Sequence, residues 1–151
     1  MDIKYGINDA FTLDAILVPD FGQTKFDNVV LNLGPFEQQF NENRPFFTEG
    51  TDLFSKGNLL YSRRIGQVPD LNLIAENESI DKGAINLVNA LKVSGRDKDG
   101  LGIGFLNAIT EKTMATVTNN DTDETRYIEI SPLSNYNVMV FDQRFNQNSS
   151  V

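Results

Sequence analysis

The chain has 151 residues, with 13 Lys or Arg and 21 Asp or Glu, so its formal net charge is −8. It contains no His, Cys or Trp. These absences exclude Ser-His-Asp and Cys-His catalysis, Cys/His zinc sites and disulfide bonds, and the acidic balance argues against a nucleic-acid partner. Carboxylate chemistry, cations held by oxygen ligands, sugar binding and a role without chemistry remain. We predict no cofactor and no bound metal.

The first two strands are expected to form a short hairpin. Residues Asp2–Ile7 alternate between apolar and polar side chains, and the following pair Asn8-Asp9 favours a turn. A second alternating stretch, Phe11–Val18, ends at Pro19. Its apolar face would carry Phe11, Leu13, Ala15 and Leu17.

A connection over residues 19–83 follows, which is too long for an inert loop in a compact domain. Within it, Pro35–Phe40 fits a short helix and Leu59–Gly66 a short strand. Five of the eleven Phe residues lie between Phe36 and Phe54. Either these aromatic residues form a small core for the connection, or they form an exposed platform that stacks sugars, with Phe46 and Phe47 as candidates.

The remaining strands are expected at Ala84–Ser94, Leu101–Thr110 and Leu133–Arg144. Between the first two, Gly95–Gly100 ends in Asp-Gly and predicts a tight hairpin turn, because these residues tolerate positive φ. Residues Glu111–Pro132 read as a long polar connection.

The predicted fold is mainly β: an antiparallel up-and-down meander of about five strands. We take residues 1–151 as one partial barrel domain, with 19–83 as a long inserted loop or plug. The connections alternate between short and long, and each strand has one apolar face and one small or polar face. This arrangement is typical of an outer-membrane β-barrel wall. A soluble meander or sandwich with one solvated face gives the same alternation.

Hydropathy alone points to a different location. The chain has no run of the ~20 apolar residues that a transmembrane helix requires. Residues Met1–Gly6 lack the apolar stretch of a signal peptide. At face value these features predict a soluble cytoplasmic protein. A β-barrel gives no such hydropathy signal, so the membrane interpretation stays open.

Carboxylates offer the remaining catalytic chemistry, as an acid–base pair acting on a glycosidic bond. The candidates are Glu49 and Asp52, which follow Glu37 and Glu42 among aromatic residues. The alternative is that these acids cap turns and pair with Arg44, Arg63 and Arg64. The acidic stretches 97–100 and 121–124 do not complete a calcium-binding loop, and turn chemistry explains them better.

Several segments resemble a known family, the C-terminal barrel domain of bacterial outer-membrane proteins classed as domain of unknown function 5916. The most specific are Arg-Pro-Phe-Phe-x-Glu-Gly at Arg44–Gly50 and Tyr-Ser-Arg-Arg-Ile-Gly at Tyr61–Gly66. The resemblance continues in further segments along nearly the whole chain, namely Phe11–Gln23, Val30–Glu37, Ala90–Arg96, Gly102–Thr110 and Pro132–Tyr136.

The resemblance implies a barrel domain that follows a signal peptide and a family-9-like carbohydrate-binding domain in a surface protein. Some members are labelled hydrolases, but the family offers no catalytic residues to carry over. A single-chain bacterial barrel has an even number of strands, about eight or more. We therefore expect this chain to be an N-terminal section of a barrel.

We predict a non-enzymatic segment of a bacterial outer-membrane β-barrel, in a surface protein linked to carbohydrate binding or handling. The expected partners are the membrane, through the parent barrel, and a glycan ligand; no nucleic acid is expected. The candidate binding residues are Phe46, Phe47, Arg63 and Arg64. Two alternatives remain: a carbohydrate-active hydrolase module that uses Glu49 or Asp52, and a soluble β-rich binding module.

Overall fold

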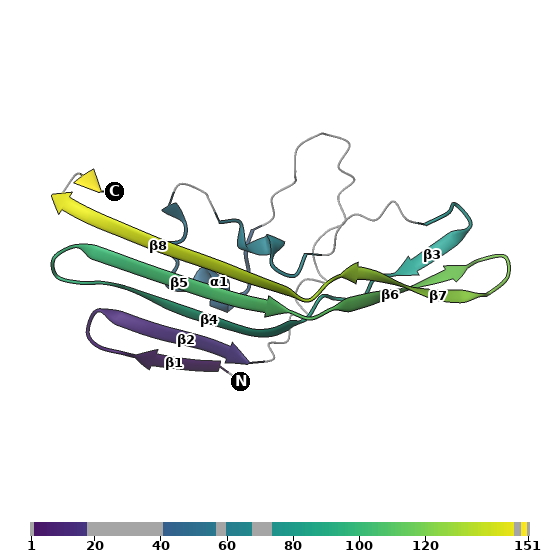
Figure 1. The fold of residues 1–151 in the computed structure, drawn as a ribbon, viewed down its shortest axis with the longest axis horizontal. Helices are drawn as coiled ribbons and strands as arrows, with labels where there is room; N and C mark the ends of the chain where they lie inside the picture. The colour runs from purple at the N-terminus through teal and green to yellow at the C-terminus, as the bar shows by residue number, and fades with distance from the viewer. Residues whose placement is uncertain (1, 18–40, 57–59, 68–73, 147–148, 151) are drawn as a thin grey trace.

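The computed structural model describes residues 2–17, 41–56, 60–67, 74–146 and 149–150. These residues form two antiparallel sheets and very little helix (Figure 1). The main sheet has the strand order β1-β2-β4-β5-β8-β9, and a smaller sheet has the order β3-β6-β7. The prediction of a mainly β, antiparallel fold is therefore confirmed.

The main sheet is an up-and-down array in which each strand pairs with its neighbours in antiparallel register. Its strands are β1 (Asp2–Gly6), β2 (Phe11–Leu17), β4 (Leu87–Arg96), β5 (Leu101–Thr110), β8 (Ser134–Asn146) and the short β9 (Ser149–Ser150). The five longer strands correspond to the five predicted ones. The prediction for Leu101–Thr110 matches β5 at both ends.

The expected number of about five strands is wrong, because the described residues also contain β3 (Glu78–Asp81), β6 (Thr113–Asn119) and β7 (Thr125–Ser131). The stretch expected to be a long polar connection holds the β6–β7 hairpin. Thr is β-branched and favours strands, but a Thr-rich stretch shows little of the alternation between apolar and polar residues from which strands are predicted. At the hairpin tip, Asn119 Oδ1 accepts hydrogen bonds from the backbone N–H groups of Asp121 and Thr122, at 2.9 and 3.2 Å.

The strand predicted at Leu59–Gly66 is also wrong, because Ser62–Arg64 form a 3₁₀ turn, η3. Its backbone bonds are local: the N–H of Ile65 donates to the carbonyl of Ser62 at 2.9 Å. The Arg44 guanidinium donates hydrogen bonds to the backbone carbonyls of Ser62 and Ile65, both at 2.8 Å. The helix predicted at Pro35–Phe40 lies outside the described residues.

The tight turns of the main sheet lie together at one end (Figure 1). In the β1–β2 turn, Asn8 Oδ1 accepts hydrogen bonds from the N–H groups of Ala10 and Phe11, at 2.8 and 2.9 Å. The predicted Asp-Gly turn between β4 and β5 is confirmed, with Gly100 at a φ of 87°. At the opposite end β2 ends and β4 begins, and β5 ends and β8 begins, and the three-stranded sheet extends from there.

The two faces of the main sheet differ in composition and in cover. One face, here called the covered face, lies under the short helix α1 (Pro45–Thr48), η3 and their neighbours (Figure 1). The other, here called the open face, has no described segment packed on it. The main apolar side chains of the open face are Ile3, Tyr5, Phe11, Leu13, Ala15, Leu17, Leu91, Val93, Leu101, Ile103, Phe105, Ile109, Met139 and Phe141.

The core lies between the covered face and the covering segment, which consists of residues 41–56 and 60–67. It contains Phe46, Phe47, Phe54 and Ile65 from the covering segment, and Leu87, Ala90, Leu106 and Ala108 from β4 and β5. The covering segment thus supplies three phenylalanine rings to the core, and β4 and β5 supply Leu and Ala side chains. None of the helices in the described part of the chain is long and apolar enough to span a membrane.

Candidate functional site

Buried ion pairs and hydrogen bonds join the covering segment, residues 41–56 and 60–67, to the covered face. Strand periodicity puts alternate residues on one face, so Lys92, Ser94 and Arg96 of β4 all point toward this segment. The segment begins its helix with Pro45 at the first turn, where a missing backbone N–H costs nothing. Three anchors hold the segment in place.

The first anchor is Lys92, whose side chain is only 1 % exposed. Its ammonium donates to the carbonyl of Phe46 at 2.7 Å and to the carbonyl of Glu49. Asp14 Oδ2 of β2 lies 3.4 Å from the same nitrogen. The ammonium also lies 4.8 Å from the centre of the Phe46 ring. One buried cation therefore ties α1 to the middle of the sheet.

The second anchor is Arg44, which is 2 % exposed and ties the two ends of the covering segment together. Its guanidinium makes a bidentate ion pair with Glu42, with distances of 2.8 Å from Nε and 2.7 Å from Nη2. Ser62 Oγ donates to Glu42 at 2.6 Å. Burial alone would raise the pKa of Glu42, but the hydrogen bonds from Arg44 and Ser62 outweigh it and lower that pKa.

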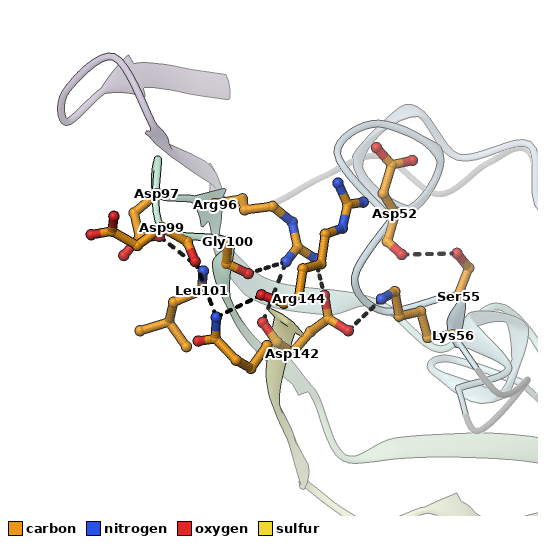
Figure 2. Close-up of polar contacts among 11 residues, drawn as sticks. Asp52, Ser55, Lys56, Arg96, Asp97, Asp99, Gly100, Leu101, Asp142 and Arg144 are labelled. Carbon is orange, nitrogen blue, oxygen red and sulfur yellow. Dashed lines mark hydrogen bonds and ion pairs between the residues drawn. The ribbon is translucent and has the colours of Figure 1, made fainter. Parts of the chain in front are cut away.

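The third anchor is Asp142 of β8, a buried carboxylate near the turn end of the sheet (Figure 2). Lys56 from the covering segment pairs with Oδ1, and Arg96 of β4 pairs with Oδ2. Arg96 also donates to the backbone carbonyl of Gly100. Because one carboxylate binds two cations, this anchor links the covering segment to two strands of the main sheet, β4 and β8.

Two glycines let the covering segment approach β5 closely. A Cβ at Gly102 would lie 2.8 Å from Leu53 Cδ2, and one at Gly104 would lie 3.0 Å from Phe54 Cζ. Both positions are on the covered face, where alternate glycine therefore makes room for side chains of the covering segment.

The predicted catalytic candidates are both exposed residues of the covering segment. Glu49 forms an ion pair with Lys4 of β1 at 2.8 Å, and this hydrogen bond lowers the pKa of the Glu49 carboxyl. A glycosidase general acid needs a raised pKa, so this environment works against that role. Asp52 forms no ion pair with any described residue. The use of either residue in hydrolysis stays a prediction.

The predicted binding candidates occupy different environments. Phe46 and Phe47 are buried at 7 % and 5 % exposure, and their rings meet edge to face with centroids 5.0 Å apart. This packing agrees with the small-core alternative, since sugar stacking requires an open ring face. Arg63 and Arg64 lie in η3, and the Arg64 guanidinium lies 5.9 Å from the centre of the Tyr61 ring. Sugar binding by these residues stays a prediction.

Sequence reasoning missed the residues that hold the site together, namely Lys92, Arg96, Asp142 and Lys56. A signal for the first was present, because Lys92 is a charged residue between the apolar Leu91 and Val93 in mid-strand. Long charged residues are almost never fully buried unless they are paired. In the described residues, no group of three or more Asp or Glu side chains is arranged to hold a metal ion.

Comparison with known proteins gives one match. The family model described as domain of unknown function (DUF5916) matches residues 1–151, which is the whole chain. No curated protein matches the chain, and no solved structure does.

Proposed function

The chain belongs to the family described as domain of unknown function 5916, and we propose that it forms part of the wall of a bacterial outer-membrane β-barrel. In this proposal the open face contacts lipid and the covered face looks into the barrel, with the covering segment as an inner plug. The role is non-enzymatic. The family description assigns no function, so the support comes from the sheet itself.

The observation that carries the proposal is the distribution of side chains between the two faces. Tyr5, Leu13, Val93, Phe105 and Met139 form a continuous row across the open face of five neighbouring strands. Met139 and Phe141 are each 64 % exposed. The next row, on the covered face, consists of Lys4, Asp14, Lys92, Leu106 and Val138.

This distribution is the reverse of the one expected in water. A soluble sheet with one open side buries its apolar face and turns polar residues to solvent. Here the face that carries the buried charged residues, beside the apolar side chains of the core, is covered, and the other face, with its continuous apolar row, is open. Soluble monomers rarely expose a large continuous apolar surface, whereas a barrel wall presents one to lipid.

Strand length and connectivity support the same proposal. β4 and β5 have 10 residues each, and a tilted strand needs ~9–11 residues to cross the hydrocarbon layer. The tight turns gather at one end and the long connections at the other, as in barrels with short periplasmic turns and long outer loops. In this orientation the β3-β6-β7 sheet belongs to the outer side.

A soluble β-rich module is the second candidate, because the covering segment and the covered face form a packed apolar core of their own. It predicts a chain that melts cooperatively as a monomer without detergent. The barrel proposal predicts that the chain aggregates or stays partly folded under those conditions. A glycan ligand for the parent protein remains a proposal that rests on the family resemblance.

Membrane fractionation of the full-length gene product tests the proposal. We expect the protein in the outer-membrane fraction, resistant to a sodium carbonate wash and released by detergent. Release by carbonate would indicate a peripheral protein. That result, or recovery in the soluble fraction without detergent, would contradict the proposal.

A further inference from the structure

A cleft of about 210 Å³ lies at the turn end of the main sheet, between the covering segment and the covered face. One side is formed by residues of the 50–56 stretch, among them Asp52 and Lys56, and the other by β4 and β8. Three basic side chains, Lys56, Arg96 and Arg144, line it (Figure 2). They come from three separate parts of the chain, so no local sequence motif brings them together.

The cleft carries a net positive charge in a strongly acidic chain. Its three cations face two carboxylates, Asp52 in the lining and Asp142 beside it. Asp142 is occupied by Lys56 and Arg96 at its two oxygens. One positive charge therefore remains uncompensated, whereas the chain as a whole has a net charge of −8.

Arg144 is the cation of this group that has no carboxylate partner among the described residues. Its guanidinium forms no ion pair or hydrogen bond with the described residues. Figure 2 shows its side chain running beside Arg96, past Asp142, toward the stretch that carries Asp52. A guanidinium offers five N–H donors in a planar fork that matches the oxygens of a carboxylate or a phosphate.

Two further donors are available in the same cleft. The Lys56 ammonium has three N–H donors, and the bond to Asp142 uses one of them. The Ser94 hydroxyl lines the cleft and bonds to no described residue. Arg96, in contrast, uses three of its five N–H donors on Asp142 and on the Gly100 carbonyl, so its main part is to shape the cleft.

We propose that this cleft is a binding site for a compact oxyanion, a carboxylate or phosphate group, with Arg144 and Lys56 as its charged contacts. Ser94 supplies a neutral donor. The site does not depend on contact between the open face and lipid, so it can be tested whether or not the chain belongs to a membrane barrel.

Isothermal titration of the full-length gene product, purified in detergent micelles, with three probes at matched ionic strength tests the site. The probes are inorganic phosphate, glucuronate as a carboxylate-bearing sugar, and glucose as a neutral sugar of similar size. We expect saturable binding of phosphate, glucuronate or both, and none of glucose. Phosphate alone would identify a phosphate ligand, and glucuronate alone a sugar acid. No saturable binding of either anion would overturn the proposal.

The Arg144→Gln variant tests the named contact. We expect it to weaken anion binding by about tenfold or more, as for the loss of a charge-assisted hydrogen bond. The control is Arg126→Gln, which removes the same charge from β7, where Arg126 pairs with Glu78. Equal losses in both variants would mean non-specific attraction and would overturn the proposal. Circular dichroism melts verify that both variants fold.

Discussion

The covered and open faces of the main sheet are built by the same strands, yet they follow opposite rules. On the covered face, charged groups such as Lys92 and Asp142 are buried, and each has its partner from another segment. On the open face, Val93 and Met139 directly follow the covered-face residues Lys92 and Val138. No described segment packs over them. In this sheet, charged side chains are buried and apolar side chains are exposed, as expected for a barrel wall between lipid and an inner compartment.

The largest expected effect is the loss of the Lys92 anchor. Lys92→Met removes a buried cation and leaves Asp14 and two backbone carbonyls without their partner, so we expect the free energy of unfolding to fall by about 3–5 kcal/mol. Val93→Met, one residue further and on the open face, should change it by about 0.5 kcal/mol or less. Urea titration in detergent micelles measures both. Equal effects would contradict the difference between the faces.

The next effect concerns the open face. Met139→Arg should destabilise the protein in phospholipid vesicles by about 2–4 kcal/mol, because a charge at mid-strand would face hydrocarbon. Phe145→Arg, on the same face of β8 but near the turn end, should cost about 0–1 kcal/mol. The measurement is the denaturant midpoint of the vesicle-bound protein. If Met139→Arg costs no more stability than Phe145→Arg, position 139 does not lie deeper in the membrane than position 145, which would contradict the proposal.

A smaller effect is expected where the covering segment approaches the wall. Gly104→Val places a side chain where a Cβ alone would lie 3.0 Å from Phe54 Cζ, and overpacking of this kind costs about 1–3 kcal/mol. Phe54→Leu should reduce that cost when both changes are combined. A double-mutant cycle measures the coupling. If the two changes in the free energy of unfolding add strictly, Phe54 is not in close contact with position 104, which would contradict the prediction.

The smallest expected effect is a pH dependence from Glu42. Its pKa is lowered in the folded protein, so it contributes stability above its unfolded pKa, which is near 4.5, and loses that contribution as the pH falls through the folded value. Glu42→Gln should therefore flatten the acid limb of the stability curve. Unfolding measured from pH 7 downward compares the two proteins. Parallel curves below pH 4.5 would contradict the role given to Glu42.

The strands of the main sheet could be predicted because their face pattern repeats every two residues, as in Leu101–Thr110. The β6–β7 hairpin could not, because its Thr-rich strands have little apolar contrast. The position of Lys92 between two apolar residues marks it as unusual, but the partners of the anchors could not be predicted, for a different reason. Lys92 and Glu49, like Lys56 and Asp142, are brought together only by long-range packing, and no local spacing reveals such a partner.

The central claim is that the open face contacts lipid and the covered face does not. The chain contains no Trp, so a single introduced Trp reports one position without background. We would place it at Phe105→Trp on the open face and at Tyr136→Trp on the covered face, and measure fluorescence quenching by brominated lipids in vesicles. The account predicts strong quenching at position 105 and little at position 136. Equal quenching at the two positions, or none at position 105, would contradict it.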